Sequence, residues 1–354
     1  MIDQTPAALK LTGSRLFTAW LADRRASLAF TTYQAGKLFF IGLQDDGRLS
    51  VFERSFARCM GLGRSPTGAL WMATLYQLWR FENFLDPGDV QNGHDAVFVP
   101  VTGHTTGDID IHDIHEDTAG QPVFVATRFN CLATLAARGS FRALWRPPFI
   151  DRLAAEDRCH LNGFDMQDGA PRYATAVSQS NVAEGWRAHR RDGGVVMEVP
   201  SGEAICGGLS MPHSPRFHNG RLWNIQSGTG EFGHVDPASG TFQPVAFLPG
   251  FARGITFIDH YAVIGVSKPR ADTFEGLALQ DRLADAGTAA RCELAVVNLR
   301  SGDVEHRLQI EGIVEELYDV TSLPGLLRPS VVGFMTNEIR FLIRPETGAP
   351  APND

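Results

Sequence analysis

Short runs of apolar and β-branched residues, separated by turn-forming residues, make up most of this chain. The runs are rich in Val, Ile, Phe, Trp and Thr, and Gly, Pro, Asp and Asn separate them, which is typical of β-strands joined by tight turns. Helical spacing of apolar residues occurs mainly at residues 14–25 and 274–286. The pattern predicts an all-β fold with a short N-terminal helix and one helical insert. Predicted strands include residues 27–33, 37–43, 48–54, 69–74, 122–126, 221–225, 254–258, 261–266 and 294–299.

One local motif recurs at intervals near fifty residues. Each copy starts at what we call a ring position, followed by a small or apolar residue and then often by further apolar or aromatic residues. The ring positions are Met60, Asp110, Asn162, His213, Arg253 and Glu316. Successive ring positions are 50, 52, 51, 40 and 63 residues apart. The last two spacings average about fifty residues, as expected if the helical insert lengthens one unit. Six such units predict a six-bladed β-propeller with one four-stranded sheet per blade.

The distribution of strands along the chain predicts how the ring closes. Little sequence follows Glu316, whereas three predicted strands within residues 27–54 precede the first ring position. We therefore expect these N-terminal strands to complete the blade that carries Glu316, and residues 1–354 to form a single propeller domain. A two-sheet sandwich with coincidental spacing is the alternative fold.

The ring positions carry groups that bind ligands. In a propeller the innermost strand of each blade runs along the axis, so we expect these residues to meet at one mouth of the central channel. One interpretation is a divalent cation site with Asp110, Asn162, His213 and Glu316 as ligands, and such oxygen and imidazole donors suit Ca, Mn, Mg or Zn. The other interpretation is a polar plug, in which Arg253 pairs with Asp110 or Glu316.

Histidines near the ring positions add further candidates. A set of His112, His160 and His213 would favour Zn, Fe or Cu, although His112 lies two residues after a ring position and is expected to pack between blades. His160 and His213 are the candidates for proton transfer, because imidazole titrates near neutrality. Arg253 is suited to hold a carboxylate or phosphate group of a substrate, with Met60 as a second substrate contact.

Composition narrows the classes of partner. The formal net charge of −8 argues against a nucleic-acid partner, which requires clustered Lys and Arg. The five cysteines are an odd number without CxxC spacing, and this predicts reduced thiols in a cytoplasmic protein. The first ten residues lack the apolar core of a signal peptide, and no apolar run is long enough to predict a membrane span.

The motifs also resemble those of known families. Asn162-Gly163-Phe164-Asp165-Met166 and His213-Ser214-Pro215 are similar to motifs of the SMP-30/gluconolactonase-like six-bladed propellers, with His213 in the place of a glutamate and Arg253 where an aspartate is usual. This resemblance implies a divalent cation and lactonase-like hydrolysis. Nearly the whole chain is similar to an uncharacterised bacterial family of β-propellers, which implies the fold and no activity. The segments that carry this second resemblance are residues 28–37, 103–108, 159–163 and 210–215.

These observations lead to one preferred function and one alternative. The preferred function is a metal-dependent enzyme that acts on a small anionic substrate at the channel mouth, by hydrolysis or by metal-assisted oxidation. The alternative is a non-catalytic propeller that binds a peptide or protein through its top face. Propellers host both classes, so the fold alone does not choose between them.

Overall fold

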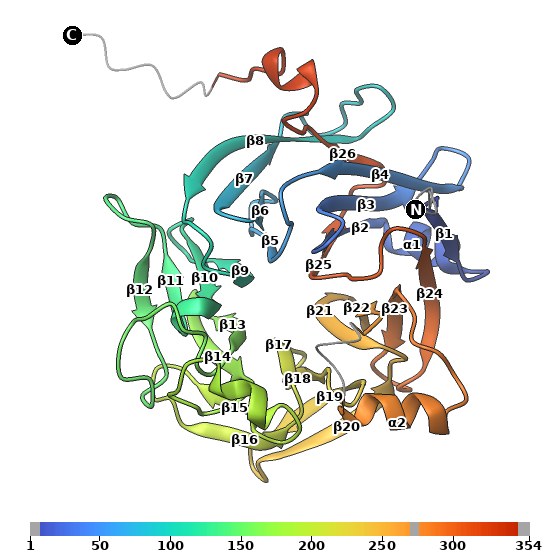
Figure 1. Ribbon diagram of the computed structural model, residues 1–354. Helices are drawn as coiled ribbons and strands as arrows, with labels where there is room; N and C mark the ends of the chain where they lie inside the picture. Colours follow the sequence, from blue (N-terminus) through green and yellow to red (C-terminus); the bar gives the residue numbers. More distant parts are fainter. Residues whose placement is uncertain (1–7, 270–275, 346–354) are drawn as a thin grey trace, which may run out of the picture.

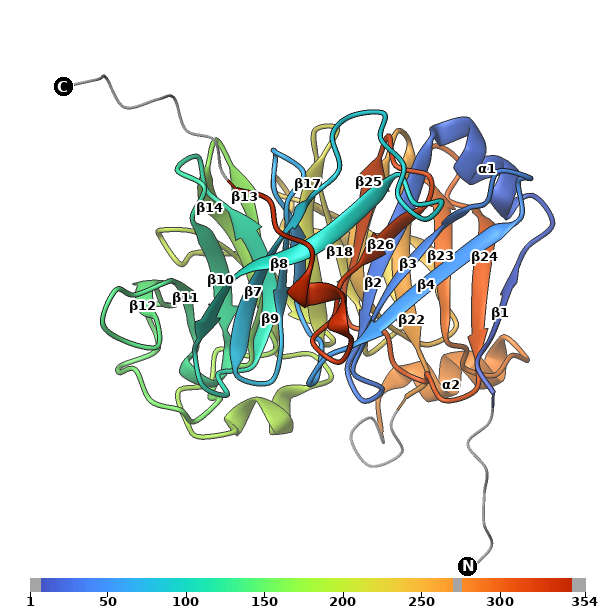
Figure 2. The same ribbon diagram turned by 90° about the horizontal axis from the view of Figure 1, so that it is seen from above.

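The computed structural model of the protein describes residues 8–269 and 276–345. Their strands form six sheets arranged radially around a central channel, as the view along the axis shows (Figure 1). This confirms the predicted six-bladed β-propeller. Two α-helices, α1 (Phe17–Arg24) and α2 (Ala278–Asp285), lie within the two predicted helical regions, and residues 274 and 275 of the predicted insert lie outside the described residues. The helices occupy opposite faces of the ring (Figure 2). No helix in the described ranges is long and apolar enough to cross a membrane.

The first three blades follow one another along the chain, and each is built from the channel outward. Blade I contains β5 (Leu62–Arg64), β6 (Leu70–Ala73), β7 (Gln77–Asn83) and β8 (Ala96–Thr105), with β26 (Pro329–Val331) added in parallel to β8. Blade II contains β9 (Ile111–Glu116), β10 (Pro122–Ala126), β11 (Cys131–Thr134) and β12 (Arg142–Trp145), with the 3-10 helix η1 (Thr127–Phe129) between β10 and β11. Blade III contains β13 (Leu161–Gln167), β14 (Ala170–Ala176), β15 (Gly194–Glu198) and β16 (Ala204–Leu209), with η2 (Gly185–His189) between β14 and β15.

The remaining blades combine both ends of the chain. Blade IV contains β17 (Pro212–His218), β18 (Arg221–Gln226), β19 (Glu231–Asp236) and β20 (Thr241–Phe247). Blade V contains β21 (Phe251–Ile258), β22 (Tyr261–Ser267), β23 (Glu293–Asn298) and β24 (Val304–Glu311), with β1 (Lys10–Gly13) at its outer edge. Blade VI contains β25 (Val320–Pro324), which follows Glu316, and then β2 (Ala26–Thr32), β3 (Lys37–Leu43) and β4 (Leu49–Ser55). The 3-10 helix η3 (Asn337–Arg340) follows β26.

Main-chain pairing between the two ends of the chain closes the ring. In blade VI, β25 pairs antiparallel with β2, and Phe30 lies opposite Val320. In addition, β1 extends blade V and β26 extends blade I. The terminal strands therefore fasten three neighbouring blades by hydrogen bonds.

The hydrophobic core is divided among the interfaces between blades. Each of the six interfaces contains its own buried apolar cluster. Between blades VI and I, for example, the rings of Phe40 and Phe98 stack with their centroids 5.6 Å apart. All five cysteines are buried and free. A single blade therefore buries its faces only against its neighbours, which is the general property of repeat folds.

Near the axis the innermost strands approach so closely that three positions require glycine. A Cβ atom at Gly254 would lie 2.8 Å from Cα of Asp319 in the next blade, and one at Gly163 would lie 3.0 Å from the main-chain nitrogen of Ser214. Gly61 packs in the same way on blade II. Gly254 also has a φ of +71°, a left-handed conformation that disfavours other residues. The glycines therefore set how tightly the blades pack around the channel.

The residue that faces each of these glycines binds the following blade. These residues are Asp113, Ser214 and Asp319, and their side-chain oxygens accept hydrogen bonds from the main-chain N–H groups of Phe164 (3.1 Å), Gly254 (3.0 Å) and Leu62 (2.9 Å), respectively. Blades with a glycine thus alternate around the channel with blades that carry an acceptor. Each acceptor blade packs closely on the glycine of the preceding blade and accepts a hydrogen bond from the following blade.

Several carboxyl groups are buried inside the channel below the mouth. Asp113 forms an ion pair with Arg216, with Oδ2 2.8 Å from Nη1. Burial raises the pKa of Asp165 to about 6, although Arg216 opposes the shift. Burial and the charge of Asp113 raise the pKa of Asp319 to about 7. The folded protein consequently holds protons near pH 5 that an unfolded chain would release.

We expect Gly254→Ala to destabilise the protein strongly. The alanine Cβ has no space against the main chain of blade VI, and overpacking of this kind costs roughly 1–3 kcal/mol. The control is Gly47→Ala, because Gly47 has a similar φ of +79° but a Cβ atom at that position would have no other atom within 4 Å. The measurement is the midpoint of urea unfolding. Equal losses in the two variants would show that backbone strain alone, and not blade packing, requires glycine at position 254.

The buried carboxyl groups predict a pH dependence of stability. A raised carboxyl pKa contributes stability that is complete below the unfolded value of about 4 and is lost as the pH rises through the folded value. The free energy of unfolding of Asp165→Asn should therefore decline less than that of the wild type between about pH 4.5 and 7. The exposed Asp168→Asn, in the adjacent turn, is the control. Identical slopes for wild type and Asp165→Asn in urea titrations would contradict this assignment.

Candidate functional site

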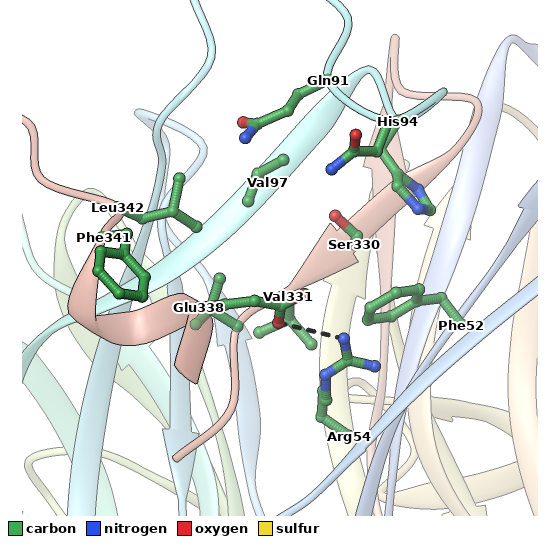
Figure 3. Close-up of a pocket in the computed structure, with 12 residues that line it drawn as sticks. Phe52, Arg54, Gln91, His94, Val97, Ser330, Val331, Glu338, Phe341 and Leu342 are labelled. Carbon is green, nitrogen blue, oxygen red and sulfur yellow. Dashed lines mark hydrogen bonds and ion pairs between the residues drawn. The ribbon is translucent and has the colours of Figure 1, made fainter. Parts of the chain in front are cut away.

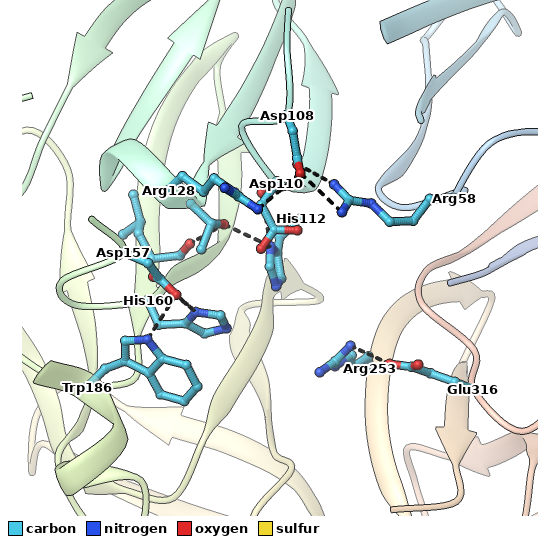
Figure 4. Close-up of polar contacts among 12 residues, drawn as sticks. Arg58, Asp108, Asp110, His112, Arg128, Asp157, His160, Trp186, Arg253 and Glu316 are labelled. Atoms are coloured by element: carbon cyan, nitrogen blue, oxygen red, sulfur yellow. Dashed lines mark hydrogen bonds and ion pairs between the residues drawn. The ribbon is translucent and has the colours of Figure 1, made fainter. Parts of the chain in front are cut away.

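A cavity of about 220 Å³ occupies one mouth of the central channel. Blades II to VI contribute its walls, so residues far apart in the sequence meet there (Figure 4). Most of the lining side chains are polar or aromatic. The lining residues are Tyr33, Asp110, His112, Asp157, His160, Trp186, Arg187, Met211, Arg253 and Tyr318.

In two blades, the residue that occupies the ring position lies two residues later in the sequence than predicted. In blade I, Met60 N–H donates to the carbonyl of Ala73, whose N–H donates back to Gly61. In blade VI the same pair of bonds joins Thr31 to Tyr318 and Asp319, so Tyr318 and not Glu316 is the residue equivalent to Met60.

Blade II needs the same correction. The Nδ1 atom of His112 lies 3.1 Å from the carbonyl oxygen of Asp110, and Nδ1 of His213 lies 2.9 Å from that of Met211. His112 is therefore equivalent to His213 and lines the cavity at the channel mouth, so the prediction that it packs between blades is wrong. Asp110 instead matches Met211, and both have a positive φ (59° and 50°). In both blades, a residue with left-handed backbone conformation turns the chain into the inner strand, and the ring residue follows two positions later. The apolar motif gave no sign of this offset.

Hydrogen bonds fix the tautomers of His112 and His213. Nδ1 of His112 lies 2.8 Å from the hydroxyl of Thr127, and Nδ1 of His213 lies 3.0 Å from the hydroxyl of Ser227. Each hydroxyl donates its hydrogen to a main-chain carbonyl of the neighbouring blade (2.7 and 2.6 Å), so each accepts from the imidazole. Nδ1 therefore carries the hydrogen, and Nε2 is left with its lone pair.

Burial also keeps both imidazoles neutral. It lowers the pKa of His112 to about 4, against the opposing effect of Asp110. Burial and the charge of Arg253 lower the pKa of His213 well below its usual value. Near neutral pH the ring therefore presents two uncharged hydrogen-bond acceptors.

A third histidine forms a dyad with an aspartate at the cavity wall. Nδ1 of His160 lies 2.9 Å from Oδ2 of Asp157, and the indole N–H of Trp186 donates to the same oxygen at 2.9 Å. The indole also stacks on the imidazole, with ring centroids 4.3 Å apart (Figure 4). Burial opposes ionisation of Asp157, but the interactions with His160 and Trp186 outweigh it and hold the pKa of Asp157 below its usual value. An ionised carboxylate thus orients His160, whose Nε2 remains available to the cavity.

In the cavity wall and close to it, several buried polar atoms have no hydrogen-bond partner within the described residues. They are Nδ2 of Asn162, Nε2 of His213, Nε of Arg253 and the hydroxyl of Tyr318. The residues Asn162, His213 and Tyr318 are only 2–4% exposed. Leaving buried polar groups unsatisfied costs roughly 1–3 kcal/mol each, so such a cluster needs a functional explanation.

Contacts across the channel show that these side chains point toward the axis. The rings of His112 and Tyr318, from blades II and VI, lie 5.2 Å apart although blade I separates the two blades in the ring. The guanidinium of Arg253 lies 5.2 Å from the ring centroid of Tyr318. Arg253 also binds Glu316, with Nη1 3.1 Å from Oε1. Glu316 therefore lies behind Arg253 as its counter-ion, as one of the two interpretations of the ring positions expected.

The predicted cation ligands do not fit a common coordination shell. Glu316 is paired with Arg253, and Oδ1 of Asn162 accepts a hydrogen bond from the Thr175 hydroxyl at 2.9 Å. Across residues 8–269 and 276–345, no three His, Cys, Asp or Glu side chains form a group that could hold a metal ion. This includes the set of His112, His160 and His213. Metal dependence stays a prediction.

The other predicted residues are divided between the cavity and its surroundings. Asp110, His160 and Arg253 line the cavity, whereas His213 is buried and bonds to the main chain of Met211, a lining residue. Met60 is fully buried in the apolar cluster between blades I and II and is not among the lining residues, so the structure does not place it as a substrate contact.

Sequence reasoning missed Asp157, Trp186 and Tyr318. Asp157 lies three residues before His160, and this spacing was its only local signal. Trp186 comes from η2, in the connection between β14 and β15, which lies outside the recurring motif. Tyr318 was hidden by the register error in blade VI.

Comparison with family models places the chain in a known family. It belongs to the family described as Domain of unknown function (DUF4915), whose model matches residues 15–332. This confirms the resemblance to an uncharacterised propeller family. None of the curated protein sequences matches the chain.

Several solved structures share the fold. A chain of a nidogen/laminin complex has a TM-score of 0.53 and 12% identity, covering 85% of this chain and 99% of that one. A protein of unknown function from Bacteroides caccae has a TM-score of 0.50 and 10% identity, covering 84% and 98%. Virginiamycin B lyase from Staphylococcus aureus has a TM-score of 0.40 and 12% identity, covering 86% and 99%. At such low identity, the two similarities with TM-scores of 0.53 and 0.50 show the fold alone.

The unpartnered hydroxyl of Tyr318 predicts an unusual effect of mutation. Tyr318→Phe should leave the free energy of unfolding unchanged or raise it by about 1 kcal/mol, because it removes a buried polar group without breaking a hydrogen bond. The matched control is Tyr261→Phe, whose hydroxyl donates to Glu305 at 3.0 Å and whose loss should cost about 1 kcal/mol. Urea unfolding measures both. Similar losses in the two variants would mean that the Tyr318 hydroxyl is satisfied in the free protein.

Proposed function

We propose that this member of the DUF4915 family is an enzyme that performs general acid–base catalysis on a small anionic substrate at the channel mouth. The observation that carries the proposal is the dyad of Asp157 and His160 at the wall of a polar cavity. A histidine whose Nδ1 is held by a buried carboxylate and whose Nε2 faces a cavity has the arrangement of a general base.

In this proposal the dyad transfers the proton. His160 accepts a proton at Nε2, and the ionised Asp157 stabilises the resulting imidazolium while fixing its orientation. Trp186 holds both partners, because it donates to Asp157 and stacks on His160. His112 and His213 are less suited to this role, because their pKa values are lowered too far for efficient proton uptake near neutral pH.

Arg253 binds the anionic group of the substrate. Its guanidinium lines the cavity, Glu316 occupies Nη1 and Nε lacks a partner within the described residues, so donors remain for a carboxylate. The amide of Asn162 and the hydroxyl of Tyr318 supply further donors, whereas Nε2 of His213 supplies an acceptor. A substrate that carries both hydroxyl and carbonyl oxygens would satisfy these groups together.

Hydrolysis is the reaction class that these groups support best. His160 takes a proton from water, the resulting hydroxide attacks an ester or lactone carbonyl, and the proton returns to the departing alkoxide. The donors of Asn162 and Tyr318 would stabilise the negative charge that develops on the carbonyl oxygen. The substrate class is therefore a small ester or lactone that bears a carboxylate.

The dyad generates a specific kinetic prediction. Among small carboxylated esters and lactones assayed in a pH-stat, the wild type should hydrolyse at least one, and His160→Gln should reduce kcat by roughly 10²–10⁴-fold. Asp157→Asn should lower kcat and move the acidic limb of the pH profile to lower pH, because the imidazolium loses its counter-ion. Arg253→Met should instead raise KM for the anionic substrate.

One control variant and two possible outcomes make this test specific. His260→Gln, in the turn between β21 and β22, should behave as the wild type. An unshifted acidic limb in Asp157→Asn would remove His160 from the role of general base. Tight binding of such compounds without turnover, unaffected by His160→Gln, would identify a binding propeller instead of an enzyme.

A further inference from the structure

A second cavity lies on the outer side of the ring, away from the channel mouth. It has a volume of about 390 Å³ and opens where β4 of blade VI meets the outer strands of blade I (Figure 3). Pockets for small molecules usually measure roughly 300–1,000 Å³. The lining residues are Phe52, Arg54, Gln91, Asn92, His94, Val97, Ser330, Val331, Val332, Glu338, Phe341 and Leu342.

Most of the wall of this outer pocket is apolar. Val97, Val331 and Val332 are at most 7% exposed and form the base, and Phe52 flanks them on β4. The segment that follows β26 covers the other side, where Phe341 and Leu342 line the pocket (Figure 3). A wall of this kind favours an aliphatic chain, because each buried methylene strengthens binding by about fourfold.

One end of the outer pocket carries a guanidinium group. Arg54 is the only Lys or Arg among the lining residues, and its side chain is 27% exposed. Its guanidinium lies 4.3 Å from the ring centroid of Phe52, which limits its contact with water on that side. One Nη1 bond goes to the carbonyl of Glu53, whereas Nε is buried and has no partner within the described residues.

The counter-ion of Arg54 is loosely held. Oε2 of Glu338 lies 3.3 Å from Nη2, and the Glu338 side chain is 51% exposed. The same oxygen also accepts a hydrogen bond from the hydroxyl of Thr336. A long ion pair at an exposed site contributes little stability, so another carboxylate can replace Glu338 at small cost. The replacement would bring a second oxygen within reach of Nε and make the contact bidentate.

We propose that the outer pocket binds a small amphipathic monocarboxylate, such as a medium-chain fatty acid. The alkyl chain lies along Val97, Val331 and Leu342, and the carboxylate binds Arg54 in place of Glu338. A phosphate or a dianion would require more than one cation, and an uncharged apolar molecule would not use the unpartnered Nε. This proposal is independent of the reaction at the channel mouth.

Isothermal titration calorimetry with decanoate tests the proposal in the full-length protein. Wild type should bind one equivalent with a micromolar Kd, and each methylene removed on going to octanoate and hexanoate should weaken binding by about fourfold. Decanol, which has the same chain length without the charge, should bind at least about tenfold more weakly, because a charged hydrogen bond to Arg54 is missing.

Variants locate the site and separate charge from shape. Arg54→Met should abolish the preference for decanoate over decanol, and Val97→Phe should weaken both by filling the cavity. Glu338→Gln should tighten decanoate binding severalfold, because it removes the competing carboxylate. Arg48→Met, in the exposed turn before β4, is the control for loss of a positive charge. Circular dichroism confirms that each variant is folded.

Three outcomes would overturn the proposal. They are no decanoate binding at millimolar concentration, equal affinities for decanoate in wild type and Arg54→Met, and weaker binding in Glu338→Gln. The last outcome would show that Glu338 contributes to the site and does not compete with the ligand.

Discussion

The close approach of the six inner strands around the channel is the constraint on which the rest of this structure depends. Gly61, Gly163 and Gly254 allow neighbouring main chains to touch, and the residues opposite them bind the next blade through side-chain oxygens. Because no blade can bury both faces alone, these contacts and the apolar clusters between blades act together. Packing at the axis thereby determines where every inner-strand side chain points.

The candidate active site is a consequence of this packing. The ring residues begin the inner strands, so tight closure brings their polar ends together away from bulk water. Hydroxyl groups that link the blades, such as those of Thr127 and Ser227, also fix the tautomers of His112 and His213. The same interactions therefore hold the blades together and orient the imidazoles at the channel mouth. The unpartnered atoms of Asn162 and Tyr318 reduce stability, and departures of this kind from full satisfaction are common at functional sites.

The two cavities differ in the polarity and charge of the residues that line them. The channel mouth is lined by polar and aromatic groups from five blades, and the ionised Asp157 and Arg253 are among them. The outer pocket has an apolar wall and a single cation, Arg54, at one end. Small polar anions match the first arrangement, whereas a chain with one charged end matches the second. One propeller can therefore offer separate sites on its axis and on its rim.

The sequence by itself determined the propeller, because a repeat of about fifty residues and strand-like patterning are local properties that every blade must express. It also selected His160, His213 and Arg253 as candidates, since each lies near a recognisable repeat motif. It misplaced the ring by two residues in blades II and VI, and in blade II the left-handed turn at Asp110 has no distinct apolar pattern that would have shown the correct position. Only the tertiary structure decided that Asp157 and Trp186 hold His160, that Glu316 neutralises Arg253, and that Arg54 meets the segment after β26. These pairs join residues through packing and hydrogen bonds between separate loops and blades, and no periodicity along the chain encodes such contacts.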